Sequence, residues 1–287
     1  MNCEKYLEHT IYFFASAFVT VLRVIFHYLQ IGFKSFIIRS YFVYLIMTFP
    51  FLKFSKGNAK LDKNTLIFNL PAGRTCPGAK NCLAFVVNEN GKRTIKRSKD
   101  TEFSCFAADS EQRFPNVFNQ RKYNLDLLNK SFKENGFNGM VNLITNSLTY
   151  YQVKHNNVFK VRIHESGDYY SMDYLKAWLE VCENKPSLKF YSYSKSLNFF
   201  DGLALPENFY LTKSYGGRYD HLIKDNERSA KVVFSESEAI NQGLAIDKDE
   251  SNCFKDDPFA LLIHGRQQAG THASKSVWAL KNKKRSG

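Results

Sequence analysis

Three cysteines of this chain stand in an arrangement that could bind a metal. Cys76 and Cys82 are separated by five residues in a loop that also holds Pro77 and Gly78, and Cys105 follows after a further 22 residues. Three thiolates can hold a [4Fe–4S] cluster with one open iron, or a zinc ion with a fourth ligand. The spacing C-x5-C-x22-C matches no short metal-binding signature, so reduced, buried thiols are the alternative interpretation.

The other three cysteines are isolated in the sequence. Cys182 lies within an amphipathic helical pattern and is most simply a core residue, while Cys3 and Cys253 stand alone. No signal peptide with a small-residue cleavage site is apparent at the start of the chain, so we expect a reducing, cytoplasmic compartment without a disulfide framework. In such a compartment, clustered cysteines indicate metal binding or catalysis.

A second group of polar residues follows the predicted strands. His164 and Asp168 come after one strand, Lys195 after the next and His264 after the last. In parallel α/β folds the loops after the strands build the active site, so these four are candidate catalytic acid/base groups or metal ligands. Smaller neighbours that could contact a cofactor, partly through backbone N–H groups that bind anions, are Ser166, Gly167, Ser214, Gly216 and Gly217.

These polar motifs also have simpler structural interpretations. Ser166, Gly167 and Asp168 could form only a turn and a helix cap, because Ser and Asp cap helices routinely. The pair Gly216 and Gly217 could serve only to turn the chain. His164 is harder to explain as packing, since an apolar strand gains nothing by ending in histidine.

The elements that would position these residues alternate along the chain, in which 44% of residues are apolar. Apolar runs predict strands at 65–70, 158–164, 188–194, 209–214, 230–235 and 259–264. Helical spacing predicts helices at 116–132, 140–150, 171–183, 218–226, 236–242 and 272–281. Residues 81–104 are predicted to form a polar hairpin or an insertion. The pattern predicts an α/β fold of parallel strands alternating with helices, as a partial or irregular (β/α) barrel or, alternatively, an open doubly wound sheet.

The chain divides into a hydrophobic extension at 1–53, an α/β domain at 54–280 and a basic tail at 281–287. Residues 10–32 and 41–52 are rich in aromatic and aliphatic residues, but Arg23 and His27 interrupt the first stretch and Pro50 ends the second. This segment could be a marginal membrane anchor or a helical hairpin packed on the domain. We favour a third interpretation, in which translation begins at Met47 and the earlier codons are upstream sequence.

The formal net charge of +13 favours acidic partners, including nucleic acid, although solubility is the plainer explanation. The positive charge is spread along the chain in several Lys-rich segments rather than in one block.

Several ordered motifs between about 54 and 278 resemble the phage gene-product-88-like family. They are FSKGNAK from Phe54, LPAG from Leu70, TCPGA from Thr75, CFA from Cys105, FPNV from Phe114, RIHESGDYYS from Arg162, FYSYSK from Phe190 and LLIHG from Leu261. The resemblance implies a protein of phages, plasmids and bacterial chromosomes that has no settled activity.

The cysteines followed by strand-end motifs also resemble, remotely, the radical S-adenosylmethionine barrels. That resemblance implies an iron–sulfur cluster and S-adenosylmethionine as cofactors. The barrels usually carry their cysteines as C-x3-C-x2-C, from which the 22 residues before Cys105 are a clear departure.

Two functions from different classes are therefore open. The first is an iron–sulfur enzyme of unknown small-molecule or nucleic-acid substrate, associated with phage or plasmid biology. The second is a non-catalytic, nucleic-acid-associated accessory factor with a structural zinc. The net charge supports the second, whereas histidine and aspartate at strand ends support the first, which we favour.

Overall fold

The computed structural model describes residues 50–58 and 60–286, and the compact unit described below spans Phe51–Gly287. The predictions for residues 1–49, including the membrane anchor and the start at Met47, lie outside the described residues. Within the described part, no helix combines the length and apolarity needed to cross a membrane. Leu52 is fully buried and donates its N–H to Ser147 Oγ at 2.9 Å, so the domain core begins before residue 54.

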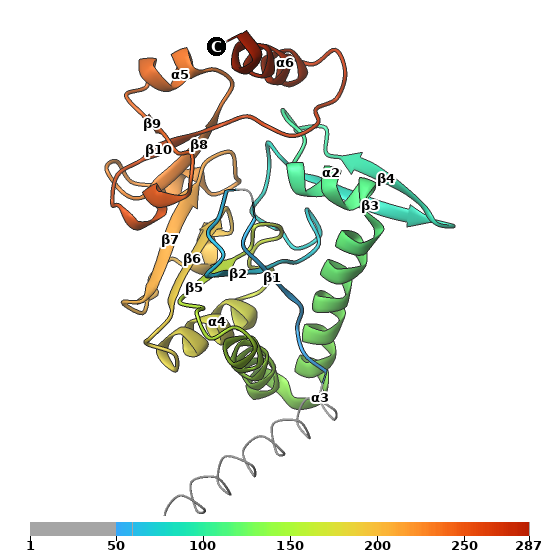
Figure 1. Ribbon diagram of the computed structural model, residues 1–287, viewed down its shortest axis with the longest axis vertical. Coiled ribbons are helices and arrows are strands. Elements are labelled where there is room, and N and C mark those ends of the chain that lie inside the picture. Colours follow the sequence, from blue (N-terminus) through green and yellow to red (C-terminus); the bar gives the residue numbers. More distant parts are fainter. Residues whose placement is uncertain (1–49, 59, 287) are drawn as a thin grey trace, which may run out of the picture. The chain divides into compact units, whose positions relative to one another are not determined.

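An open sheet of eight strands forms the centre of this unit (Figure 1). β1 (Phe54–Lys56) pairs antiparallel with β2 (Thr65–Phe68), and all later pairings are parallel. The order continues through β5 (Lys160–Ile163), β6 (Lys189–Ser194), β7 (Phe209–Ser214), β8 (Ser229–Val233), β10 (Phe259–Leu262) and β9 (Ala245–Ile246).

The α/β fold predicted from the sequence is confirmed. From β2 to β8 the parallel strands lie side by side in chain order, which is the order of a (β/α) barrel, but the sheet does not close. A doubly wound sheet would reverse its strand order near the middle, and no such reversal occurs between β2 and β8. The sheet is therefore best described as a partial barrel.

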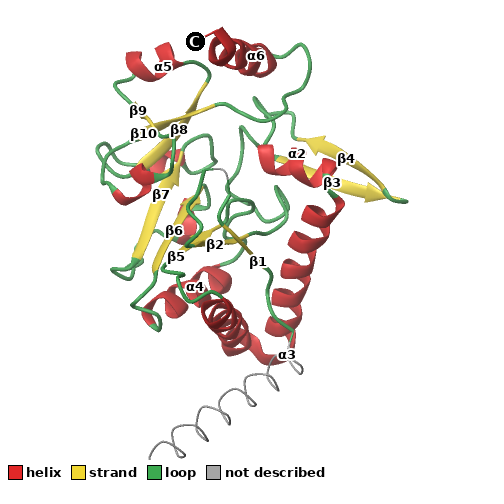
Figure 2. Ribbon diagram, viewed as in Figure 1, coloured by secondary structure: helices red, strands yellow, loops and turns green. Residues whose placement is uncertain are grey.

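One face of the sheet packs against α3 (Pro115–Lys154) and α4 (Met172–Glu183) around the fully buried Trp178 (Figure 2). α4 begins where Ser171 Oγ accepts the N–H of Tyr174, as expected of an N-cap. α3 is broken at Gly136, where φ is 61°, so it consists of two helical segments as the sequence predicted.

The opposite face of the sheet carries aromatic side chains, because successive residues of a strand point to opposite sides. Tyr191 and Tyr193 of β6 pack there with Phe259 and with Phe254 of the short helix η3 (Ser251–Phe254). Arg162 of β5 lies among them, with its guanidinium 4.3 Å from the Tyr193 ring centroid. This face forms the floor of the site described below.

A separate hairpin of β3 (Ala84–Glu89) and β4 (Lys92–Arg97) precedes α2 (Phe106–Arg113), as predicted for 81–104. Its turn residues Asn90 and Gly91 both have positive φ, the conformation that suits a two-residue hairpin. The hairpin and α2 pack together around a small group of alanines.

Two elements near the C-terminus differ from the prediction. The helix expected at 218–226 is only a 3-10 turn, η2 (Asp220–Leu222), because the Asp220 carboxylate is engaged by the preceding glycine turn. α5 (Glu236–Asn241) is as expected. α6 (His272–Ser286) continues through most of the predicted basic tail, because no glycine or proline interrupts the sequence before Gly287.

Candidate active site at the carboxyl ends of the strands

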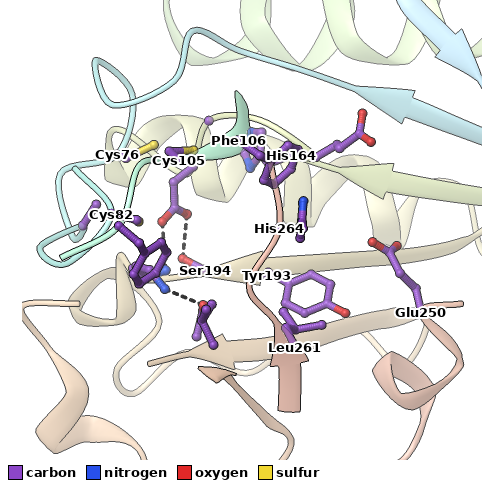
Figure 3. A pocket seen from close by; sticks show the side chains of 18 of the residues that line it. Cys76, Cys82, Cys105, Phe106, His164, Tyr193, Ser194, Glu250, Leu261 and His264 are labelled. Carbon is purple, nitrogen blue, oxygen red and sulfur yellow. Dashed lines mark hydrogen bonds between the residues drawn. The ribbon is translucent and has the colours of Figure 1, made fainter. Parts of the chain in front are cut away.

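A cavity of about 540 Å³ opens where the parallel strands end, a volume suited to a small-molecule ligand. Loops after β2, β5, β6 and β10 contribute to its lining, together with Ser214 of β7, Val232 of β8 and the segment that leads into α2. Figure 3 shows the three cysteines grouped on one side of the cavity, with Tyr193, Glu250 and His264 on the other. Sequence positions that are almost 190 residues apart, such as Cys76 and His264, therefore face one space.

The predicted metal ligands Cys76, Cys82 and Cys105 all line this cavity and are partly exposed to it. Burial raises the pKa of the Cys76 thiol, and the negative charges of Asp168 and of the two other cysteines raise it further. The pKa of Cys105 is raised to about 11 by burial and by Cys82, although the N–H groups at the start of α2 oppose this shift. At neutral pH the three groups are accordingly thiols that resist ionisation.

The three sulfurs share the cavity without forming a ready site for a single ion. Among residues 50–58 and 60–286, no group of three or more His, Cys, Asp or Glu side chains is arranged so that it could hold a metal ion. The cysteines come from two segments, one following β2 and one preceding α2.

The loop that bears Cys76 and Cys82 is held against β6 and β7 at a glycine. A Cβ on Gly78 would lie 2.0 Å from the Lys195 carbonyl oxygen, so only glycine permits this approach. The same loop pairs with the turn after β7, where Ala79 bridges Gly217 and the Gly216 carbonyl accepts the N–H of Asn81 at 3.0 Å.

The glycine turn thus has a structural partner in place of an external anion. Gly216 and Gly217 donate their N–H groups to the Asp220 carboxylate at 2.9 and 2.8 Å. Neither glycine belongs to the cavity lining. These contacts position the cysteine loop, whereas the sequence had suggested a cofactor contact for this pair.

Cys105 is positioned through a buried ion pair between α2 and α3. Glu111 of α2 accepts a hydrogen bond from Arg121 Nη1 of α3 at 2.9 Å and another from the N–H of Ala72 at 2.8 Å. Ala72 precedes the Cys76 loop, so this one carboxylate connects both cysteine-bearing segments.

Asp168 holds the loops after β5 and β6 together. Its carboxylate accepts the Ser194 hydroxyl at 2.7 Å and the N–H groups of Tyr169 and Lys195 at 2.8 Å each, and a longer bond from Ser196 at 3.2 Å. Burial raises the pKa of Asp168, and these hydrogen bonds oppose the shift. Although Asp168 lines the cavity, most of its hydrogen-bonding capacity is used internally, which favours a positioning role.

His164 is held in an unusual backbone conformation, with φ at 66°, a region that few non-glycine residues adopt. Its Nε2 lies 2.8 Å from the Tyr174 hydroxyl, and the Tyr169 ring meets it edge-on at 4.7 Å. The side chain lines the cavity at only 3% exposure, and Nδ1 has no hydrogen-bond partner among the described residues. Burial first, and Arg162 second, lower the pKa of His164 well below its usual value, so the imidazole is neutral.

The other predicted catalytic residues stand at the rim of the cavity. The Lys195 ammonium donates to Ser214 Oγ at 2.6 Å and to the Tyr215 carbonyl at 2.5 Å. His264 stacks on Phe106 at 4.7 Å between centroids, and partial desolvation together with Lys60 lowers its pKa.

Two small residues after β5 fix the conformation of this loop. Ser166 is buried outside the cavity lining, where its hydroxyl donates to the Leu70 carbonyl at 2.9 Å. Gly167 lines the cavity with φ at 89°, and a Cβ there would lie 2.7 Å from that of Leu70.

Sequence reasoning did not select three further residues of the cavity, namely Arg162, Tyr193 and Glu250. Arg162 Nε donates to Glu250 Oε2 at 3.1 Å, and both side chains are largely buried. A charged residue within the apolar strand VFKVRIH is the signal that identifies Arg162. No local pattern points to Glu250, which lies 88 residues later in the chain.

An open parallel sheet with polar groups and thiols around a cavity at its carboxyl edge defines an α/β protein with a candidate active site. The chain belongs to the gene product 88 family, whose family model matches residues 52–280. No curated protein and no solved structure matches the chain. The family resemblance seen in the sequence motifs is thereby confirmed.

Proposed function

We propose that this chain is a metal-dependent enzyme in which Cys76, Cys82 and Cys105 hold an iron–sulfur cluster at one side of the cavity. The observation that carries the proposal is that three thiols from two distant segments line one ligand-sized cavity together with a neutral, strained histidine. Buried thiols without a function have no reason to converge on a cavity.

The arrangement of the thiols supports a cluster over a structural zinc. The ligands of one zinc ion lie about 2.0–2.3 Å from it and surround it closely. A four-iron cluster is much wider, so its cysteine sulfurs stand farther apart. Three thiols that share a cavity but come from two separate segments agree better with the wider group.

A cluster with three cysteine ligands would keep one iron open to the cavity and supply single-electron chemistry there. The protein's own groups would then bind and orient the substrate. His164 lines the cavity and its Nδ1 has no hydrogen-bond partner among the described residues, and the Arg162–Glu250 pair provides a polar floor. Apolar residues, including Phe106 and Leu261, would exclude water from the remaining wall.

The proposal is tested by purifying the full chain without air and measuring iron, acid-labile sulfide, zinc and the visible absorption spectrum. We expect iron and sulfide in similar amounts and a broad visible absorption that changes on reduction. Replacing Cys76, Cys82 or Cys105 with Ser should remove most of both. Cys182→Ala is the matched control, because Cys182 of α4 is buried in the core and does not line the cavity.

Zinc in place of iron, bound by the same three cysteines, would support the accessory-factor alternative instead. No bound metal after anaerobic reconstitution with iron and sulfide, with all three Cys→Ser variants behaving as the wild type, would overturn the metal hypothesis. Adding S-adenosylmethionine to the loaded protein and recording its electron paramagnetic resonance spectrum tests the more specific prediction about the second cofactor.

A further inference from the structure

The C-terminal part of the chain is strongly and uniformly basic. From Pro258 to the end it contains six Lys or Arg residues and no Asp or Glu. Four of these basic residues are packed into the last seven positions, within or next to α6 (His272–Ser286). Lys275 and Lys281 of α6 therefore have no acidic partner within the same segment.

α6 uses its apolar residues to attach itself to the domain. Ala273 and Val277 are buried in a cluster with Ile263, and Phe103 and Phe234 pack against it. This contact buries the apolar residues Ala273 and Val277 of the helix, so the opposite face of α6 is turned outward.

The outward face carries a tryptophan between lysines. Trp278 is 68% exposed, and Lys275 and Lys281, one turn before and after it, are exposed as well. Residues three apart on a helix are neighbours on its surface. An exposed tryptophan is unusual because the side chain is large and mostly apolar. Trp178, the other tryptophan of the chain, is fully buried.

The buried side of α6 adjoins the wall of the cavity. Ile263 and Phe103 line the cavity and also belong to the cluster that holds α6. A helix is roughly 10 Å across, so a ligand on the outer face of α6 would lie about one helix diameter from the cavity wall.

We propose that the exposed face of α6 binds single-stranded nucleic acid, with a base stacked on Trp278 and phosphates next to Lys275 and Lys281. Aromatic side chains combined with basic residues are the usual means by which proteins hold unpaired strands, because every base has a face that can stack. This binding does not depend on the iron–sulfur cluster.

Charge and side-chain distribution favour this ligand over an anionic membrane. A membrane-surface helix needs a continuous row of Trp, Phe or Leu to insert between lipids. The apolar residues Ala273 and Val277 are buried inside the domain, which leaves Trp278 as the one large apolar side chain exposed on the described part of α6. A duplex would also bury its base faces and leave the tryptophan without a stacking partner.

The test uses the full chain and labelled oligonucleotides of about a dozen nucleotides, one of deoxythymidine and one of uridine, with binding followed by fluorescence anisotropy. Intrinsic tryptophan emission is recorded in parallel, since Trp178 is shielded and Trp278 would be quenched by stacking. We expect binding that weakens steeply between about 50 and about 200 mM salt. The two oligonucleotides distinguish DNA from RNA as the preferred strand.

Trp278→Ala should reduce the affinity about tenfold, and Lys281→Glu should reduce both the affinity and its salt dependence. The matched control is Lys176→Glu on α4, which makes the same charge change at another exposed lysine and should have little effect. The proposal is overturned if neither strand binds, or if binding is the same in Trp278→Ala and wild type. It is also overturned if only anionic vesicles, and not oligonucleotides, shift the tryptophan emission.

Discussion

The neutral state of His164 has a consequence for stability that a single substitution can isolate. In the folded protein the buried imidazole resists protonation, because its pKa is well below the usual value of 6.5. In the unfolded chain the same group takes up a proton at about pH 6.5. As the pH falls below 6.5, protonation therefore stabilises the unfolded state, and His164 makes the fold progressively less stable.

The size of this effect follows from the difference in bound protons. For one group that is protonated only in the unfolded state, the free energy of unfolding falls by about 1.4 kcal/mol per pH unit. Between pH 7 and pH 5 the loss amounts to about 2 kcal/mol and not to the full slope over two pH units, because the unfolded group is only partly protonated near pH 7. With an exposure of only 3%, His164 has little solvent screening to reduce this value.

The assay is urea unfolding of the wild type and of His164→Asn at pH 8, 7 and 5. Asparagine tolerates the left-handed backbone at this position but does not titrate. The wild type should lose about 2 kcal/mol more than the variant between pH 7 and 5, whereas the difference between the two proteins should stay constant from pH 8 to 7. Parallel pH profiles for both proteins would refute the neutral, buried state of His164.

Three further predictions concern the cysteine-bearing segments. In Gly78→Ala the added Cβ would lie 2.0 Å from the Lys195 carbonyl oxygen, so the loop must move back by about 1.4 Å to reach an ordinary 3.4 Å contact. Chemical labelling of the cysteines in this loop, Cys76 and Cys82, should therefore accelerate. An unchanged labelling rate would contradict the close approach. Alkylation of Cys105 in the metal-free protein should be slow at neutral pH and rise towards pH 11, since its pKa is about 11; a plateau near pH 8 would disagree. Arg121→Ala leaves the Glu111 carboxylate buried without its partner, so the free energy of unfolding measured by urea titration should fall by about 3–5 kcal/mol. A loss below about 1 kcal/mol would contradict this prediction.

Local sequence patterns were sufficient to predict most of the sheet and helices. β7 has the predicted bounds, and β2, β5, β6, β8 and β10 fall within the predicted ranges or one residue outside them. These strands are short apolar runs between helical segments, so the periodicity of each could be read without its neighbours. The helix expected at 218–226 was wrong because the Asp220 carboxylate is committed to the glycine turn, a tertiary preference that periodicity cannot reveal.

The candidate site was predicted in part for a similar reason. Parallel strands place their following loops at one edge of the sheet, so His164, Lys195 and His264 could be assigned to one region from their order alone. The convergence of Cys105 with Cys76 was a hypothesis that the spacing could not decide. The convergence depends on the contact of Glu111 with the segment that leads to Cys76. The number of residues between two segments does not reveal whether they meet in the folded chain.

By itself, the sequence determined the strand and helix pattern, the edge of the sheet at which polar groups gather, and the membership in the gene product 88 family. The tertiary structure decided what each polar group does there. It made Asp168 a loop-binding carboxylate, left Nδ1 of His164 without a hydrogen-bond partner among the described residues, and paired Arg162 with Glu250. Burial and hydrogen-bond partners set these roles, and both depend on which distant segments meet in the folded chain.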